Sequence, residues 1–257
     1  MLTKGLLGND AQEDPLTLFT WNQTPVRLHR SFLWLAGVYV SYELITVGAP
    51  AAARALLLGL GVFGSVLLHE MGHAAMARHF GIATHSITLY PFGGLAALDR
   101  EPSTPAAEAL VALAGPAVNF ALAAAAVPLA ALGLPGAGLF LGLNLVLGLF
   151  NLLPAFPMDG GRVLRAWWTR RHGRSVATLK ALKLAQAFGW VFIVLGFLGP
   201  GSLLLVGGFL LVIVRSERTR WQSAAAYRAH TGREAPWMTP DFSSRTSSSR
   251  AWSHPAA

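Results

Sequence analysis

The sequence predicts an all-α polytopic membrane protein with six transmembrane helices and a small β-hairpin or sheet between the second and third helices. Of its 257 residues, 53% are hydrophobic and only 12% are charged, whereas an average soluble domain carries about 25% charged residues. The apolar residues also gather into runs close to the length of about 20 residues that a membrane helix needs. The six runs cover residues 31–50, 55–78, 106–132, 138–153, 178–198 and 202–214.

The remaining segments are polar or rich in turn residues. Residues 1–30 are polar and contain two prolines, so we expect an irregular cytoplasmic or interfacial arm. Residues 81–100 are rich in Thr, Ile and Leu and contain proline and glycine, which predicts one or two short strands with a turn. Residues 223–257 are rich in Ser, Pro and Arg and are expected to be disordered. The predicted membrane core is therefore 31–222.

The charge distribution predicts the orientation of the helices. The net charge is +8, but the cations lie between apolar runs and form no stripe with interleaved aromatic residues, so we expect no nucleic-acid partner. Cations gather at 162–183 and again from Arg215 onward, whereas the connections at 133–137 and 199–201 carry none. The positive-inside rule then predicts a multi-pass protein of the cell membrane with both termini in the cytoplasm.

One short motif in the second run points to a metal. His69-Glu70-Met71-Gly72-His73 places two imidazoles one helical turn apart, where they can hold one ion. The adjacent Glu70 can then act as general base on a metal-bound water. The alternative is a polar face that packs against a neighbouring helix. Because a charged group within the bilayer costs about 2.5–3.5 kcal/mol and usually marks function, we favour the metal site.

The chain contains no cysteine, so a metal must be held by His, Asp or Glu. A zinc hydrolase takes three protein ligands and a water. The candidates for the third ligand within the predicted core are Glu43 and Asp159. Asp159 follows the fourth run toward the cytoplasm and matches the depth of His69, whereas Glu43 is expected to lie deeper in the membrane. The alternative role for Asp159 is the N-cap of a helix that begins near Arg162.

Four motifs, in this order, resemble those of the site-2 protease family of intramembrane metalloproteases. The resemblance covers about residues 60–170. The motifs are His69-Glu70-x-x-His73, Tyr90-Pro91-Phe92-Gly93-Gly94, Gly115-Pro116-x-x-Asn119 and Asn151-x-x-Pro154-x-x-Pro157-Met158-Asp159-Gly160-Gly161.

The resemblance implies an intramembrane zinc metalloprotease. One zinc ion would be bound by His69, His73 and Asp159, and Glu70 would activate water. The substrates would be transmembrane segments of membrane-tethered proteins, and hydrolysis would require such a helix to unwind.

The same resemblance implies substrate-binding residues. Asn151 would contact the substrate near the scissile bond, and Asn119 would lie near the site. The segment with Gly93 and Gly94 would offer a strand edge to an unwound substrate, or else be a plain connecting hairpin. From the residues alone, Asn144 is expected to make an interhelical hydrogen bond.

Two non-catalytic functions are alternatives to the protease. A membrane carrier of metal ions would be expected to show ligands at several depths or repeated halves, and this sequence shows one cluster and no repeat. A pseudoprotease that chaperones membrane helices would be expected to have lost Glu70 or a ligand, and all are present. The complete set of roles therefore favours an enzyme.

Overall fold

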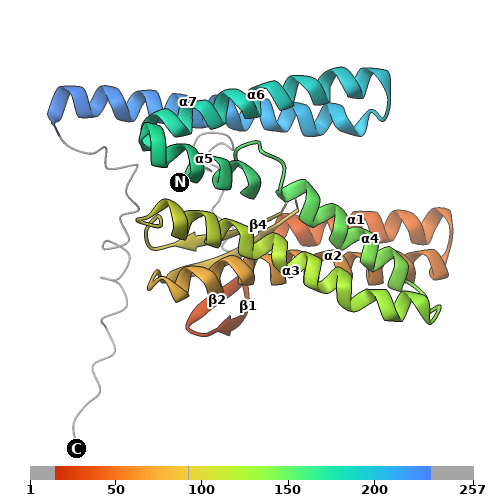
Figure 1. The fold of residues 1–257 in the computed structure, drawn as a ribbon. Helices are drawn as coiled ribbons and strands as arrows, with labels where there is room; N and C mark the ends of the chain where they lie inside the picture. The colour runs from red at the N-terminus through yellow and green to blue at the C-terminus, as the bar shows by residue number, and fades with distance from the viewer. Residues whose placement is uncertain (1–14, 92, 233–257) are drawn as a thin grey trace, which may run out of the picture.

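The computed structural model describes residues 15–91 and 93–232. The chain is mostly helical, with a small sheet toward one end of the bundle and the α6–α7 hairpin lying as a separate layer (Figure 1). The elements are β1 (Leu16–Trp21), β2 (Thr24–Leu28), α1 (Arg30–Thr46), α2 (Ala49–His79), β3 (Thr84–Tyr90), β4 (Gly93–Leu98), α3 (Pro105–Ala131), α4 (Ala137–Asn151), α5 (Asp159–His172), α6 (Arg174–Leu198) and α7 (Ser202–Thr231).

Three of the described helices, α2, α3 and α6, are long and apolar enough to cross a membrane. The helix α4 is apolar but only 15 residues long, and α1 has 17 residues. This confirms a helical membrane protein with a small sheet. The presence of six membrane spans stays a prediction.

The predicted hairpin at 81–100 is confirmed as β3 and β4, but the sheet is larger than expected. Its order is β1-β2-β3-β4, with β2 and β3 parallel and the other neighbours antiparallel. The prediction of an irregular arm is therefore wrong over 16–28. Asn22 and Gln23 both have positive φ, at 49° and 68°, which suits a tight hairpin turn. The fully buried Val26 then pairs with Ile87.

The Arg-rich stretch at 162–180, between the fourth and fifth predicted runs, forms most of α5 and the start of α6, which are separated by Gly173 at a φ of 75°. The prediction for the end of the chain is wrong in part. Residues 223–231, expected to be disordered, continue α7, because this stretch is rich in alanine, the best helix former. The helix ends at Gly232, in the left-handed conformation. Residues 233–257 and 1–14 lie outside the described residues.

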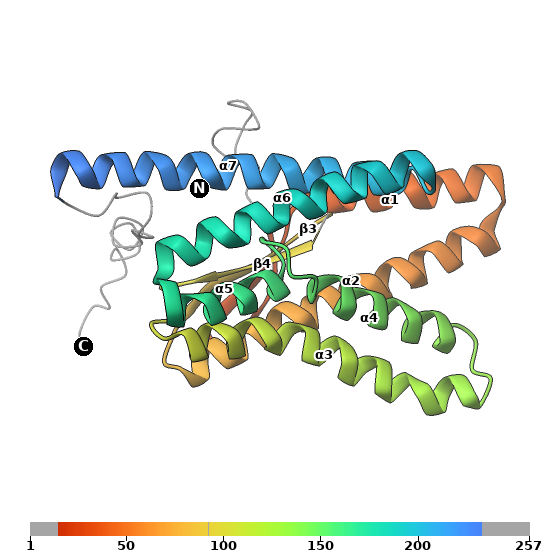
Figure 2. The same ribbon diagram turned by 45° about the horizontal axis from the view of Figure 1, so that its top comes forward.

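The helix α3 is central to the packing. It contacts α2, α4 and α5, whereas α7 packs along α6, and α6 packs against α5 and the segment that precedes it (Figure 2). The N-terminus of α3 is capped by Thr104, whose side chain accepts a hydrogen bond from the backbone N–H of Ala107. The metal-site residues therefore come together where α2, α3 and α5 meet.

Candidate metal centre

The two histidines of α2 lie side by side in the interior. His69 and His73 are 6% and 5% exposed, and their Nε2 atoms are 3.1 Å apart. The helical spacing thus places both imidazoles on one face, as the motif predicts. This face turns toward α3 and α5.

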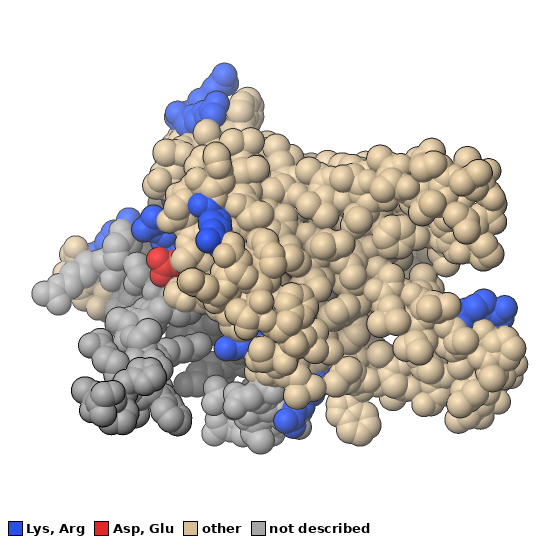
Figure 3. All heavy atoms as spheres, turned by 90° about the horizontal axis from the view of Figure 1, so that it is seen from below, with Lys and Arg blue, Asp and Glu red and all other residues tan. Residues whose placement is uncertain are grey.

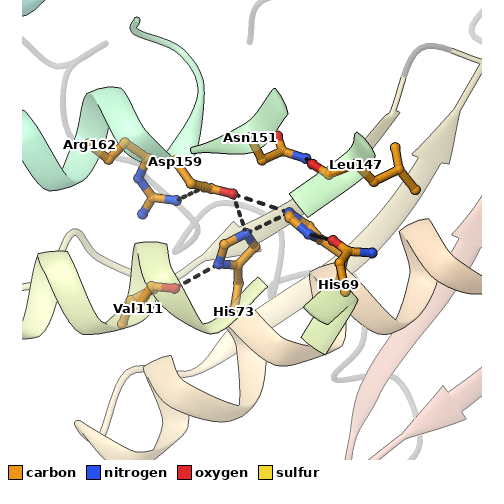
Figure 4. A network of polar contacts seen from close by, with 8 residues as sticks. His69, His73, Val111, Leu147, Asn151, Asp159 and Arg162 are labelled. Carbon is orange, nitrogen blue, oxygen red and sulfur yellow. Dashed lines mark hydrogen bonds and ion pairs between the residues drawn. The ribbon is translucent and has the colours of Figure 1, made fainter. Parts of the chain in front are cut away.

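Asp159 completes a triangle with the two imidazoles. Its Oδ2 lies 3.2 Å from the Nε2 of His69 and 3.2 Å from the Nε2 of His73 (Figure 4). Asp159 is the first residue of α5, and the N-cap position belongs to Met158, so the capping alternative is wrong. Glu43, the other candidate ligand, lies on α1 and is not part of this group.

The spacing and chemistry of the three groups suit a zinc ion. The edges of the triangle are 3.1–3.2 Å, and ligand atoms about 2.0–2.1 Å from a tetrahedral zinc are about 3.3 Å apart. Two imidazole nitrogens and a carboxylate oxygen are also ligands that zinc accepts. His69, His73 and Asp159 can therefore bind one such ion with only a small adjustment.

Hydrogen bonds from α3 orient the imidazoles. The Nδ1 of His69 lies 2.6 Å from the Oδ1 of Asn119, and the Nδ1 of His73 lies 2.7 Å from the backbone oxygen of Val111. Because both partners are acceptors, each Nδ1 carries the proton and each Nε2 keeps a lone pair directed at the site. Asn119 in turn donates to the Oδ1 of Asn144 at 3.0 Å, which confirms the interhelical hydrogen bond expected for Asn144.

Glu70 lies beside the triangle in a buried position, 9% exposed. The backbone of β4 passes so close that a Cβ at Gly94 would lie 2.2 Å from the Cγ of Glu70. On the other side, a Cβ at Gly115 would lie 2.4 Å from the Nε2 of His73. The two glycines therefore let β4 and α3 approach the site. They explain in steric terms why glycine stands at these places in the motifs.

The sequence model of peptidase family M50 matches residues 56–137 and 135–196, more than half of the chain. The chain belongs to peptidase family M50. The solved structure of the site-2 protease from Methanocaldococcus jannaschii is 32% identical, has a TM-score of 0.62, and aligns over 79% of this chain and 95% of that chain.

Two relatives whose names call them zinc metalloproteases are longer than the part that aligns with this chain. Rip3 from Mycobacterium tuberculosis is 40% identical over 223 residues, and the zinc metalloprotease MJ0392 from Methanocaldococcus jannaschii is 30% identical over 211 residues. Each alignment covers 80% of this chain, but 54% of Rip3 and 60% of MJ0392. The chain thus spans a little over half the length of these two relatives.

In this M50 family member, most of the predicted site residues surround one cavity of about 400 Å³. The residues of the predicted site that line it are His69, Glu70, His73, Gly94, Asn151 and Asp159. Gly93, whose φ is 139°, is the first residue of β4 and precedes Gly94 on the cavity wall.

Asn119 lies next to the metal site, in contact with His69, but it does not line the cavity. It is fully buried behind His69, with its amide held between His69 and Asn144, so the structure gives it no contact with the cavity. The sequence offered no signal for Val111, because its contribution is a backbone oxygen.

Proposed function

We propose that this chain is an intramembrane zinc metalloprotease that hydrolyses peptide bonds in transmembrane segments of membrane-tethered proteins. The observation that carries the proposal is the buried triangle of His69, His73 and Asp159 with Glu70 in the same cavity. The names of its relatives, a site-2 protease and a zinc metalloprotease, support the same activity.

His69, His73 and Asp159 would hold the zinc ion, which would supply Lewis-acid polarisation of a carbonyl and activation of a water molecule. Glu70 is the proposed general base. It takes a proton from the attacking water and returns it to the leaving amine, which lets one carboxylate serve both halves of the hydrolysis. Asn119 and Val111 keep the imidazoles in the tautomer that binding requires.

The sheet offers a way to present the substrate. A transmembrane helix satisfies its own backbone hydrogen bonds, so it must unwind before a peptide bond can be cut. The strand β4 forms one of the two edges of the sheet, and Gly94, Leu95 and Ala96 line the cavity. We propose that the unwound segment pairs with this edge. Asn151, on the cavity wall, would contact it near the scissile bond.

The proposed topology has six spans, formed by α1, α2, α3, α4, α6 and α7, with both termini in the cytoplasm. The α1–α2, α3–α4 and α6–α7 turns lie at the same end of the molecule, away from the sheet (Figure 1). On the face shown in Figure 3, basic side chains lie mainly toward the sheet end, and a broad uncharged band separates them from one basic patch at the other end. This asymmetry supports a cytoplasmic sheet end.

The decisive experiment replaces Glu70 by glutamine in the purified, reconstituted chain. Glu70→Gln should lower the rate of cleavage by about 10²–10⁴-fold, the usual contribution of a general base. Bound zinc, counted by elemental analysis, should stay stoichiometric. The probe is a vesicle-embedded reporter whose single transmembrane helix contains glycine and proline, assayed by the appearance of its fragment.

Glu43→Gln is the matched control, because Glu43 lies on α1 outside the site, and its cleavage rate should equal that of the wild type. Undiminished cleavage by Glu70→Gln would overturn the role of Glu70. Wild-type protein that holds no zinc would overturn the proposed function.

A further inference from the structure

The helix α3 touches the elements that carry all three proposed ligands. Val111 and Asn119 hold the two histidines of α2. A third contact, from the first turn of α3, reaches α5, which carries Asp159. This contact is an ion pair between Glu108 and Arg165, two residues that are 57 positions apart in the sequence.

The pair is almost completely buried, with Glu108 at 2% and Arg165 at 5% exposure. The Nε of Arg165 donates to the Oε1 of Glu108 at 2.7 Å, and a second guanidinium nitrogen contacts the same oxygen. Two donors on one buried carboxylate oxygen fix the relative position of α3 and α5 more closely than a single contact would.

Arg165 also contacts the chain on the other side of Asp159. Its guanidinium lies over the ring of Phe156 at 5.4 Å from the centroid, in the segment that leads from α4 into α5. On α5 itself, Arg162 and Arg165 follow Asp159 at intervals of three residues and so lie along one side of the helix. The side chain of Arg165, which belongs to α5, therefore contacts both α3 and the segment that precedes Asp159.

The energetics of burial argue that the pair has a specific role. Two charges removed from water are costly, and an apolar pair of similar volume often packs as well or better. Here the pair spans the two helices whose relative position decides whether Asp159 meets the imidazoles.

We propose that Glu108 and Arg165 position the third metal ligand, by fixing α5 against α3 at the distance that the triangle requires. This inference rests on the proposed function, since it assumes that the triangle holds zinc. Neither residue contacts the reacting atoms in this proposal; both are positioning residues that act through Asp159.

The test is the zinc affinity of the full chain, measured by competition with a chelator at fixed pH. Glu108→Gln should weaken zinc binding by up to about 10–100-fold, the range that is common when a direct partner of a ligand is lost. Arg165→Lys keeps the charge but loses the planar fork and the stacking on Phe156, so it should weaken binding to a similar extent. Excess zinc should restore cleavage in both variants.

The matched control is Glu217→Gln, which removes the partner of Arg220 on α7, away from the cavity, and should leave zinc affinity unchanged. A purely packing role for the pair would lower the melting temperature of both variants while their zinc affinity stayed that of the wild type. That result would overturn the positioning role and leave the proposed protease intact.

An absence of zinc from the wild type would instead overturn the proposed function. If either single variant fails to fold, the double variant Glu108→Gln, Arg165→Met decides, because it leaves no unpaired charge buried. Weakened zinc binding in the folded double variant would support the positioning role, and wild-type affinity would overturn it.

Discussion

The inner helices α2–α5 and the outer hairpin α6–α7 are held together in different ways. The inner helices bury a group of polar and charged side chains: Ser65, His69, Glu70, His73, Glu108, Asn119, Asn144, Asp159 and Arg165. In the described part of the hairpin, Thr178 is the one buried polar residue, and its hydroxyl donates to the backbone oxygen of Arg174. The inner region is thus joined by directional contacts between helices.

The hairpin packs through small residues instead. A Cβ at Gly189 would lie 2.8 Å from Leu211, and a Cβ at Gly207 would lie 2.7 Å from the backbone oxygen of Gly189. Such close approach of two backbones is a usual way to join membrane helices without polar groups. The outward faces keep large apolar side chains, such as Leu198 and Leu205 at 81% and 79% exposure, which suits contact with lipid.

The two regions should therefore respond differently to mutation. A polar change in the inner helices disturbs groups that point at one another, so it should alter metal binding. In the hairpin, loss of the Thr178 hydroxyl breaks only a local bond within α6, so it should leave metal binding unchanged.

The largest effect is expected from the loss of a ligand. Asp159→Ala removes the one carboxylate of the triangle, so the two imidazoles alone should bind zinc more than about 100-fold more weakly, and cleavage should be abolished. The comparison variant is Thr178→Ala, which removes the buried hydroxyl of the hairpin and should keep stoichiometric zinc. Elemental analysis of both purified proteins gives the answer. Full zinc content in Asp159→Ala would contradict the assignment of the third ligand.

Local sequence patterns predicted the parts of the fold that depend on neighbours in the chain. The one-turn spacing of His69 and His73 required only a helix, and the hairpin of β3 and β4 required only strand formers around a turn. The proximity of Asp159 followed from membrane depth and from the resemblance to a known family.

Contacts between distant segments were missed. The parallel pairing of β2 with β3 joins strands separated by two helices, and no periodicity reports it. The ion pair of Glu108 with Arg165 links residues 57 positions apart. The helix α5 is not among the six predicted apolar runs, because its arginines lower the hydropathy, although five of its residues are buried. Mean hydropathy identifies a membrane-spanning helix, but it does not identify an amphipathic helix, whose polar face lowers the average.

A second prediction concerns the orientation of a ligand. Asn119→Leu keeps a similar volume but removes the acceptor for the Nδ1 of His69, so the ring loses its fixed tautomer and orientation. Zinc affinity should fall about 10–100-fold. The control in the hairpin is Gln186→Leu, which changes a partly exposed amide on α6 and should leave affinity unchanged. Equal chelator-competition curves for the wild type and Asn119→Leu would contradict a positioning role for Asn119.

The smallest effect is expected at the strand beside the general base. Gly94→Ala places a Cβ 2.2 Å from the Cγ of Glu70, so the carboxylate must move while His69 and His73 stay in place. Since a displacement of about 1 Å can cost about 10²-fold and this side chain can yield in part, we expect a loss of about 10-fold in cleavage rate with full zinc content.

The matched control is Gly208→Ala on α7, where an added Cβ would meet nothing within 4 Å and the rate should not change. The double variant Glu70→Gln, Gly94→Ala separates the two explanations of a slow Gly94→Ala variant. If Gly94 acts through the carboxylate of Glu70, the second substitution should add little to the loss caused by the first, because their effects are not independent. Full additivity would instead assign Gly94 to the pairing of β4 with substrate.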